Sequence, residues 1–131
     1  MKDYILCGLV VVLLILFVVS KYMYLPVAFF VVGGSSMKPT LNMGDIIIGL
    51  RESFSEGDIV VWCTTSFSCV AHRVISVNEN YVVTKGDNNP LHDLPIPKSF
   101  VKYKVIGSIP LTVWFPLLIL FSLLYLSLIH I

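Results

Sequence analysis

Two long uncharged apolar runs flank a middle segment in which apolar and polar residues alternate over short distances. The first run covers residues 4–20 and ends at Lys21, and the second covers residues 105–131. A helix needs about 20 apolar residues to cross the hydrocarbon core of a bilayer. The second run is long enough by itself, and the residues after Lys21 lengthen the first if this lysine extends toward the headgroups. We therefore expect an N-terminal transmembrane anchor over residues 1–25 and a C-terminal transmembrane helix over residues 107–131.

A cleaved signal peptide is the alternative interpretation of the first run. Its apolar region is long for such a peptide, and no small-x-small cleavage site follows it. Pro110 and Pro116 can start or kink the second helix. A buried soluble core is a weaker explanation for both runs, because a chain of 131 residues has too little polar surface to cover two such helices.

The residues between the two runs predict short strands separated by turns. Short stretches rich in Val, Ile and Phe alternate with Gly, Asn, Asp and Pro, which is typical of antiparallel strands. No helical period extends over residues 33–104. We therefore expect a mainly β protein, with an antiparallel sheet or small barrel as the domain over residues 26–106. The expected strands cover residues 27–32, 45–50, 58–63, 70–77, 81–85 and 101–106.

Composition and charge exclude several classes of protein. Hydrophobic residues make up 56% of the chain and charged residues 13%, which is too apolar for an ordinary soluble domain. Basic and acidic residues are balanced over residues 38–104, so neither a nucleic-acid surface nor a sensor of lipid charge is indicated. Charge bias around the apolar runs is too small for the positive-inside rule to decide their orientation.

The cysteines indicate an oxidising compartment. Cys63 and Cys69 enclose TTSFS between two strand-like stretches, a spacing that fits a disulfide across a hairpin. Such a bond implies the non-cytoplasmic side of a membrane. Two free thiols remain an equal alternative. A zinc site is not expected, because no other Cys or His lies at ligand spacing, and Cys7 is expected to face lipid.

Ser35 and Ser36 are the candidate nucleophiles of a serine hydrolase. Such an enzyme needs a hydroxyl, a base that takes its proton, and donors for the developing oxyanion. Both serines follow Gly33-Gly34, which lets backbone amides approach a substrate closely, and Pro39 stiffens the turn after them. A flexible polar turn is the simpler interpretation of this segment.

Four side chains are candidates for the base. His72 lies inside a strand-like stretch and is expected to face the side opposite to its two neighbours. His92 lies beside loop carboxylates, and His130 lies at the membrane end. Lys38 is close to Ser36 but would have to lose its charge, and nothing nearby in the sequence would desolvate it.

Asp87 and Asp93 are the candidate carboxylates that orient the base, and both lie in the polar loop GDNNPLHD. The alternatives are an Asx turn at Asp87 and a solvated loop position for Asp93. Spacing alone does not choose between the two residues.

Five short blocks occur in a specific order along the chain. Together they resemble the type I signal peptidases, the membrane-bound serine proteases that remove signal peptides. The resemblance covers residues 31–93, with an apolar run before it, as in that family. The blocks are SMKPTL at 36–41, GD at 44–45, GDIVVW at 57–62, AHRVI at 71–75 and KGDNN at 85–89.

The resemblance implies a role for each candidate. Bacterial members have Lys before Arg-Val-Ile, whereas this chain has His72, as does the archaeal and endoplasmic-reticulum branch that uses Ser and His with aspartates. Ser36 is then the nucleophile and His72 the general base. Asp93 is implied as the partner of His72, and Asp87 as a second essential acid or a structural one. Family members commonly place a Ser for the oxyanion hole where this chain has Gly34, so the hole would rest on the Ser36 amide and another donor.

The resemblance also implies an activity, partners and a location. The chain would be a serine endopeptidase that cleaves signal peptides from secreted preproteins after small residues of the Ala-x-Ala type, without a metal or cofactor. Its partners would be preprotein signal peptides, the lipid bilayer and the protein translocation machinery, but no nucleic acid. It would be integral to the plasma membrane or endoplasmic reticulum, with its catalytic domain on the extracytoplasmic side. Residues 27–32, with Phe29 and Phe30, would rest on the membrane surface.

Three other functions fit parts of the same pattern. One is a specialised protease of this family with a restricted set of substrates. Another is a non-catalytic membrane subunit with a relict site, which Gly34 favours. The third is a small structural membrane protein with a β-rich domain, which the five ordered blocks make a weaker explanation.

Overall fold

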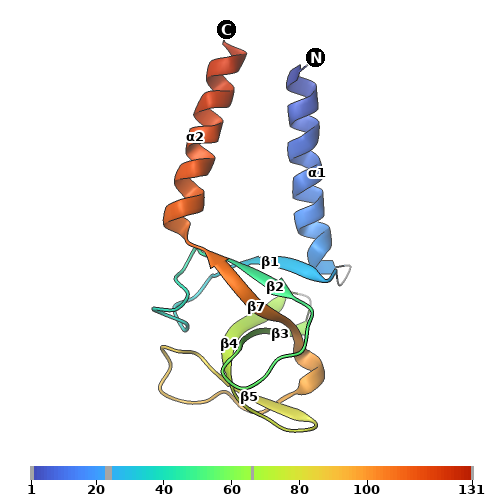
Figure 1. The fold of residues 1–131 in the computed structure, drawn as a ribbon, viewed down its shortest axis with the longest axis vertical. Helices are drawn as coiled ribbons and strands as arrows, with labels where there is room; N and C mark the ends of the chain where they lie inside the picture. Colours follow the sequence, from blue (N-terminus) through green and yellow to red (C-terminus); the bar gives the residue numbers. More distant parts are fainter. Residues whose placement is uncertain (1, 23–24, 66, 131) are drawn as a thin grey trace.

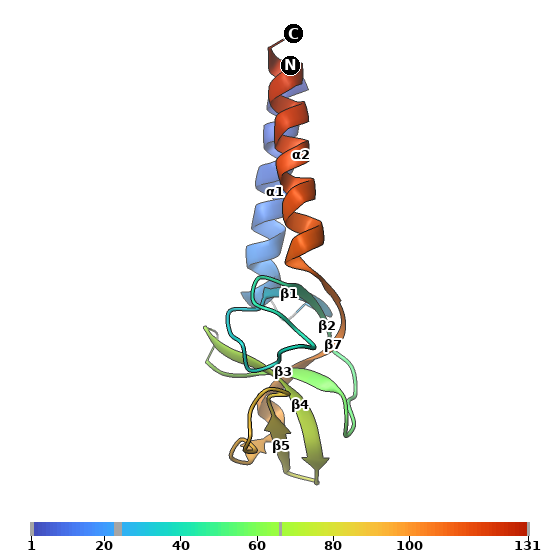
Figure 2. The same cartoon turned by 90° about the vertical axis from the view of Figure 1, so that its left-hand side faces the viewer.

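Two long helices extend side by side from one end of a β-sheet domain (Figure 1). The computed structural model describes residues 2–22, 25–65 and 67–130. Helix α1 (Lys2–Tyr22) leads into the first strand, and helix α2 (Leu111–Ile129) follows the last. Figure 2, turned by 90°, shows that both chain ends lie at the far ends of the helices, away from the sheet.

The domain is built on one antiparallel sheet in the order β1-β2-β7-β3-β4-β5-β6. The expectation of a mainly β, antiparallel fold is therefore confirmed. Within the described residues no strand pair joins β1 to β6, so the sheet has two edges and is not a closed barrel. The strands are β1 (Val27–Val31), β2 (Ile46–Leu50), β3 (Ile59–Thr65), β4 (Ser68–Val77), β5 (Tyr81–Lys85), β6 (Ile96–Pro97) and β7 (Val101–Ile109).

The last part of the sheet departs from the sequence-based expectation. The short strand β6 pairs with β5, and a 3-10 helix over Lys98–Phe100 joins it to β7. Strand β7 continues to Ile109, past the expected end at residue 106. Pro110 then ends the strand, because proline has no N–H for the ladder, and α2 begins at the next residue.

Two hydrophobic clusters form the core, and they lie on opposite faces of β3. Val60 belongs to one cluster and Val61 to the other, as the alternation of side chains along a strand requires. The Val61 cluster contains Ala28, Met37, Leu41, Ile47 and Tyr103, whereas the Val60 cluster contains Val74, Val82 and Ile96.

The same alternation divides the residues of β1. Phe30 packs edge-on against Tyr103, with ring centroids 5.6 Å apart, and it contacts the Val61 cluster. Phe29 and Val31 are exposed. The expectation that Phe30 lies on the membrane surface is therefore wrong, because only alternate residues of β1 point away from the core.

Helix α2 is long and apolar enough to cross a membrane, by length and composition. It has 19 residues, and none of them is buried. The apolar part of α1, Tyr4–Val19, is shorter, so a membrane-spanning role for α1 remains a prediction. The side chain of Lys21, expected to reach the headgroups, lies outside the described residues.

Asp45 and Gly44 attach the start of α2 to the sheet. The buried Asp45 carboxylate accepts hydrogen bonds from the backbone N–H of Leu111 (3.1 Å) and of Asn42 (2.8 Å). The indole N–H of Trp114 donates to the Gly44 carbonyl at 2.9 Å. Gly44 has a φ of 90°, a conformation that other residues adopt only with strain. The base of α2 is thus held by the segment between β1 and β2.

Cys63 and Cys69 form a disulfide, which confirms the pairing expected from their spacing. They lie directly opposite each other on β3 and β4. The bond closes the hairpin just before its turn, so it constrains how the turn lies against the rest of the domain.

Candidate active site

Ser36, His72 and Asp93 meet in the structure although they come from three separate parts of the chain. Ser36 lies after β1, His72 within β4, and Asp93 between β5 and β6. His72 Nε2 lies 3.0 Å from Ser36 Oγ, and His72 Nδ1 lies 2.5 Å from Asp93 Oδ2. His72 is only 6% exposed, so its ring has little freedom to turn away from these two partners.

Thr84 fixes the Asp93 carboxylate from the other side. Its hydroxyl donates to Asp93 Oδ2 at 2.7 Å, and its carbonyl accepts from the Asp93 N–H at 2.8 Å. Thr84 is fully buried on β5, next in the alternation to the buried Val82. Sequence reasoning missed Thr84, although a hydroxyl at a core position of a strand signals a need for a polar partner.

The segment Gly86–Asn89 positions Ser36. The Asn88 backbone N–H donates to the Ser36 carbonyl at 2.7 Å, and the Asn88 side-chain amide donates to the Ser35 carbonyl at 3.1 Å. A Cβ at Gly86 would lie 2.6 Å from the Ser36 carbonyl oxygen, which is too close for any other residue without a shift. Backbone-to-backbone contact therefore sets where the Ser36 hydroxyl points.

Asp87 binds Arg73 and Thr40, and in the described part of the chain it has no hydrogen bond to His72. The Arg73 guanidinium donates to both carboxylate oxygens, at 2.8 and 2.7 Å, and also to the Gly57 carbonyl at 2.8 Å. The Thr40 hydroxyl donates to Asp87 at 2.5 Å. The hydrogen bond from Arg73 lowers the pKa of Asp87 below its ordinary value. Asp87 therefore stays ionised and links its loop to the segment after Ser36.

The other candidate residues lie apart from this arrangement. Lys38 and His92 are exposed, and His130 lies just after the end of α2. Ser35 is exposed and holds Asn88 through its carbonyl oxygen, not its hydroxyl.

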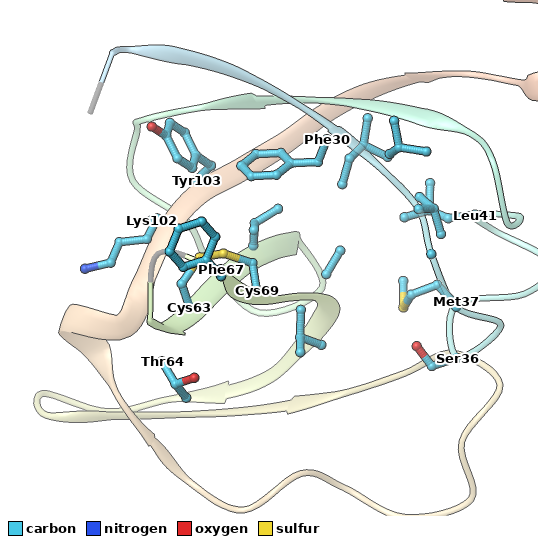
Figure 3. Close-up of a pocket in the computed structure, with 18 of the residues that line it drawn as sticks. Phe30, Ser36, Met37, Leu41, Cys63, Thr64, Phe67, Cys69, Lys102 and Tyr103 are labelled. Carbon is cyan, nitrogen blue, oxygen red and sulfur yellow. A yellow bond between two sulfur atoms is a disulfide. The ribbon is translucent and has the colours of Figure 1, made fainter. Parts of the chain in front are cut away.

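A groove of about 760 Å³ begins at Ser36 and runs along the β3–β4 hairpin (Figure 3). The part next to Ser36 is lined by apolar side chains of the Val61 cluster and by Ala71. The far part is lined by the disulfide, Phe67 and Lys102. A mainly apolar groove that ends at a hydroxyl suits an extended peptide whose backbone reaches that hydroxyl.

Gly34 leaves open space where the resemblance places a serine. A Cβ at this position would meet no atom within 4 Å, and the residue is exposed at the edge of the groove. A side-chain donor at position 34 is therefore lacking because of the residue type and not because of crowding. The expectation that an oxyanion hole rests on the Ser36 amide and another donor stays a prediction.

A hydroxyl, an imidazole and a carboxylate in this order can support nucleophilic attack on a carbonyl. Comparison with curated proteins gives no match to this chain. The profile of a protein family described as "Signal peptidase, peptidase S26" matches residues 1–107. This match spans helix α1, the residues that line the groove, and the candidates Ser36, His72, Asp87 and Asp93. The chain therefore belongs to the peptidase S26 family of signal peptidases.

Proposed function

We propose that this protein is a membrane-bound serine endopeptidase that removes signal peptides from secreted preproteins, with Ser36 as nucleophile. The observation that carries the proposal is the pair of hydrogen bonds that His72 makes, one to Ser36 and one to Asp93. Family membership supplies the substrate class. We infer from His72, which stands where a lysine base would be, that the chain belongs to the Ser-His branch of the family.

His72 acts as general base and then as general acid. Its Nε2 takes the Ser36 proton as Oγ attacks the scissile carbonyl, and it returns that proton to the leaving amine. A water activated by the same nitrogen then hydrolyses the acyl-enzyme. Asp93 accepts the Nδ1–H, which leaves the lone pair on Nε2, and it stabilises the imidazolium during both steps.

Two free strand edges form the sides of the peptide site. Strand β5 pairs with β4 only from Arg73 onward, so the described residues Ser68–His72 have β3 alone as a partner. Among the described residues strand β1 pairs with β2 alone, and the residues after it, up to Gly34, line the groove. An extended substrate binds between these two strand edges as an additional strand, and its backbone N–H and C=O groups pair with theirs.

The floor of the groove next to Ser36 favours small side chains. Val61 and Ala71 are opposite each other on β3 and β4, and Ile47 and Met37 pack beside them with 2% exposure each. A closely packed apolar floor leaves little depth under the residue whose carbonyl reaches Ser36. We infer cleavage after small residues at positions −1 and −3, of the Ala-x-Ala type.

The helices anchor the domain so that its active site lies close to the bilayer surface, where the signal helix of the substrate ends. Strand β1, with the exposed Phe29 and Val31, lies directly beside the base of the helices (Figure 1). We infer that α2 and α1 both span the bilayer and that β1 lies at its surface. The Cys63–Cys69 disulfide supports an extracytoplasmic domain, because cytosolic thiols are kept reduced.

Replacement of Ser36 or His72 tests this function directly. In detergent micelles or vesicles, Ser36→Ala and His72→Ala should each lower preprotein cleavage by about 10⁵-fold or more, because nucleophile and base act as one unit. Thermal unfolding should stay close to that of the unchanged protein. Full cleavage by Ser36→Ala would show that another residue is the nucleophile.

A non-catalytic subunit is the second candidate, and Gly34 is the observation that favours it. A serine-reactive phosphonate separates the two functions. An active enzyme should bind the phosphonate covalently at Ser36, and His72→Ala should abolish the labelling. An intact protein that neither cleaves preprotein nor reacts with the probe would be the relict subunit.

A further inference from the structure

The end of the groove that lies away from Ser36 has no assigned role. It is bounded by the disulfide-closed hairpin between β3 and β4, with Phe67 in the turn just before β4 begins (Figure 3). Phe67 is 84% exposed, although phenylalanine is among the side chains most often buried. A bound chain that follows the groove therefore passes the exposed ring of Phe67 at its rim.

Side chains on one face of the hairpin line the groove at regular intervals along its length. Val61 lies opposite Ala71, and Cys63 lies opposite Cys69, two residues further from the active site. Phe67 lies two residues before Cys69 in the turn itself, and the pairing of β3 with β4 shifts register between Cys63 and Thr65. Side chains on one face of a strand repeat every second residue, about 6.6 Å apart, and an extended peptide has the same repeat.

The direction of the bound peptide follows from the proposed function, on which this inference rests. Beyond Ser36, away from the hairpin, Gly86 and Asn88 lie against the Ser36 carbonyl, and they are not among the residues that line the groove. A peptidase that selects small residues before the cleaved bond needs its groove on that side. The N-terminal part of the substrate therefore lies along the hairpin.

The positions of the substrate can then be counted outward from the catalytic pair. His72 reaches Ser36 at 3.0 Å, so residue −1 lies level with His72 and its neighbour Ala71. Residue −3 lies level with Cys63 and Cys69, which line the groove. Residue −5 then lies beside the turn that carries Phe67.

The Phe67 end of the groove carries one positive charge, and Thr64 and Thr65 line it together with apolar groups. Phe100 and the disulfide line the groove there, and Lys102 is the one charged side chain among the described residues that line it. An apolar side chain covers the Phe67 ring and removes its surface from water, whereas a cation would be repelled by Lys102.

We propose that the disulfide-closed hairpin forms an additional specificity site, in which Phe67 binds an apolar side chain of the substrate at position −5. The ligand class is a leucine-sized or phenylalanine-sized residue, at the end of the signal peptide nearest the cleavage site. The Cys63–Cys69 bond holds the turn so that Phe67 stays level with this residue.

Peptides that share residues −4 to +2 and differ only at −5 test the site. With the full chain in detergent micelles, Leu or Phe at −5 should raise kcat/KM about tenfold over Asn, mainly through KM. The neutral Asn avoids an ion pair with Lys102. Phe67→Ala should abolish the difference, and because this side chain is exposed its loss should leave thermal unfolding unchanged.

Tyr81→Ala is the matched control, because Tyr81 is an aromatic residue with 51% exposure on β5 and does not line the groove. It should retain the full preference. The double variant Cys63→Ser/Cys69→Ser should weaken the preference, because the turn is then no longer held by the disulfide.

Two results would overturn the proposal in different ways. Equal cleavage of all peptides, or a preference that persists in Phe67→Ala, would remove the hairpin site and leave the peptidase intact. An absence of cleavage by both the unchanged protein and Ser36→Ala would overturn the proposed function and this site together.

Discussion

Asp87 and Asp93 lie in one loop but have different partners, so their replacement should have different effects. Asp93→Asn keeps the shape of the side chain but places an amide beside His72 Nδ1, which favours the wrong tautomer. We expect kcat for preprotein cleavage to fall by about 10³–10⁴-fold, with little change in KM. Single-turnover assays in detergent measure this loss, and thermal unfolding should change little.

Asp87→Asn is the matched comparison for that variant. It leaves the Arg73 guanidinium without its carboxylate, so we expect a clearly lower unfolding temperature and a smaller loss of kcat. If Asp87→Asn abolishes turnover while the fold persists and Asp93→Asn remains active, the roles of the two acids are exchanged.

Sequence reasoning found the reacting residues more easily than the residues that hold them. Ser36 and His72 could be proposed because few hydroxyls and imidazoles suit the chemistry, and the ordered blocks narrowed the choice. Spacing alone could not separate Asp87 from Asp93, because a loop of irregular shape decides which one reaches β4. Thr84 was missed since its role depends on a contact across the loop.

At the scale of the elements, alternation predicted most strands within one or two residues. The expected strand at residues 81–85 coincides with β5, because half-buried strands show a clear period of two. The two-residue β6 was missed, since Pro95 precedes it, Pro97 is its second residue, and strand signals need a longer stretch. The order β2-β7-β3, which joins distant segments, is not encoded in any local pattern.

The contact between the two active-site loops gives a prediction at this scale. Gly86→Ala would place a Cβ 2.6 Å from the Ser36 carbonyl oxygen, a backbone atom that cannot rotate away. The two loops must separate, and the Ser36 hydroxyl then moves relative to His72. Because small misplacements of reacting groups are costly, we expect kcat to fall by about 10–100-fold.

Gly107→Ala is the matched control for Gly86→Ala, because a Cβ at Gly107 meets no atom within 4 Å. It should keep the activity of the unchanged protein. Equal kcat for both variants would mean that the 86–89 segment does not position Ser36. Steady-state kinetics with a preprotein substrate provide the comparison.

At the scale of the whole molecule, the two helices are matched in length. Helix α1 has 21 residues and α2 has 19, so each is about 30 Å long, close to the hydrocarbon thickness of a bilayer. Their far ends are linked by a contact of 3.7 Å between the Cys7 sulfur and the Tyr125 hydroxyl. A pair of this kind suits two spans that cross together and leave the sheet domain on one side.

Cysteine accessibility tests this arrangement in intact cells or sealed vesicles. In a Cys7→Ser background, with Cys63 and Cys69 joined, an introduced cysteine is the one thiol that a membrane-impermeant maleimide can label. Glu79→Cys should react from the extracytoplasmic side, because it lies in an exposed turn of the sheet domain. Asp3→Cys and His130→Cys should react only after the membrane is opened. If Asp3→Cys reacts without opening while His130→Cys stays protected, then α2 alone crosses the membrane and α1 lies along its outer surface.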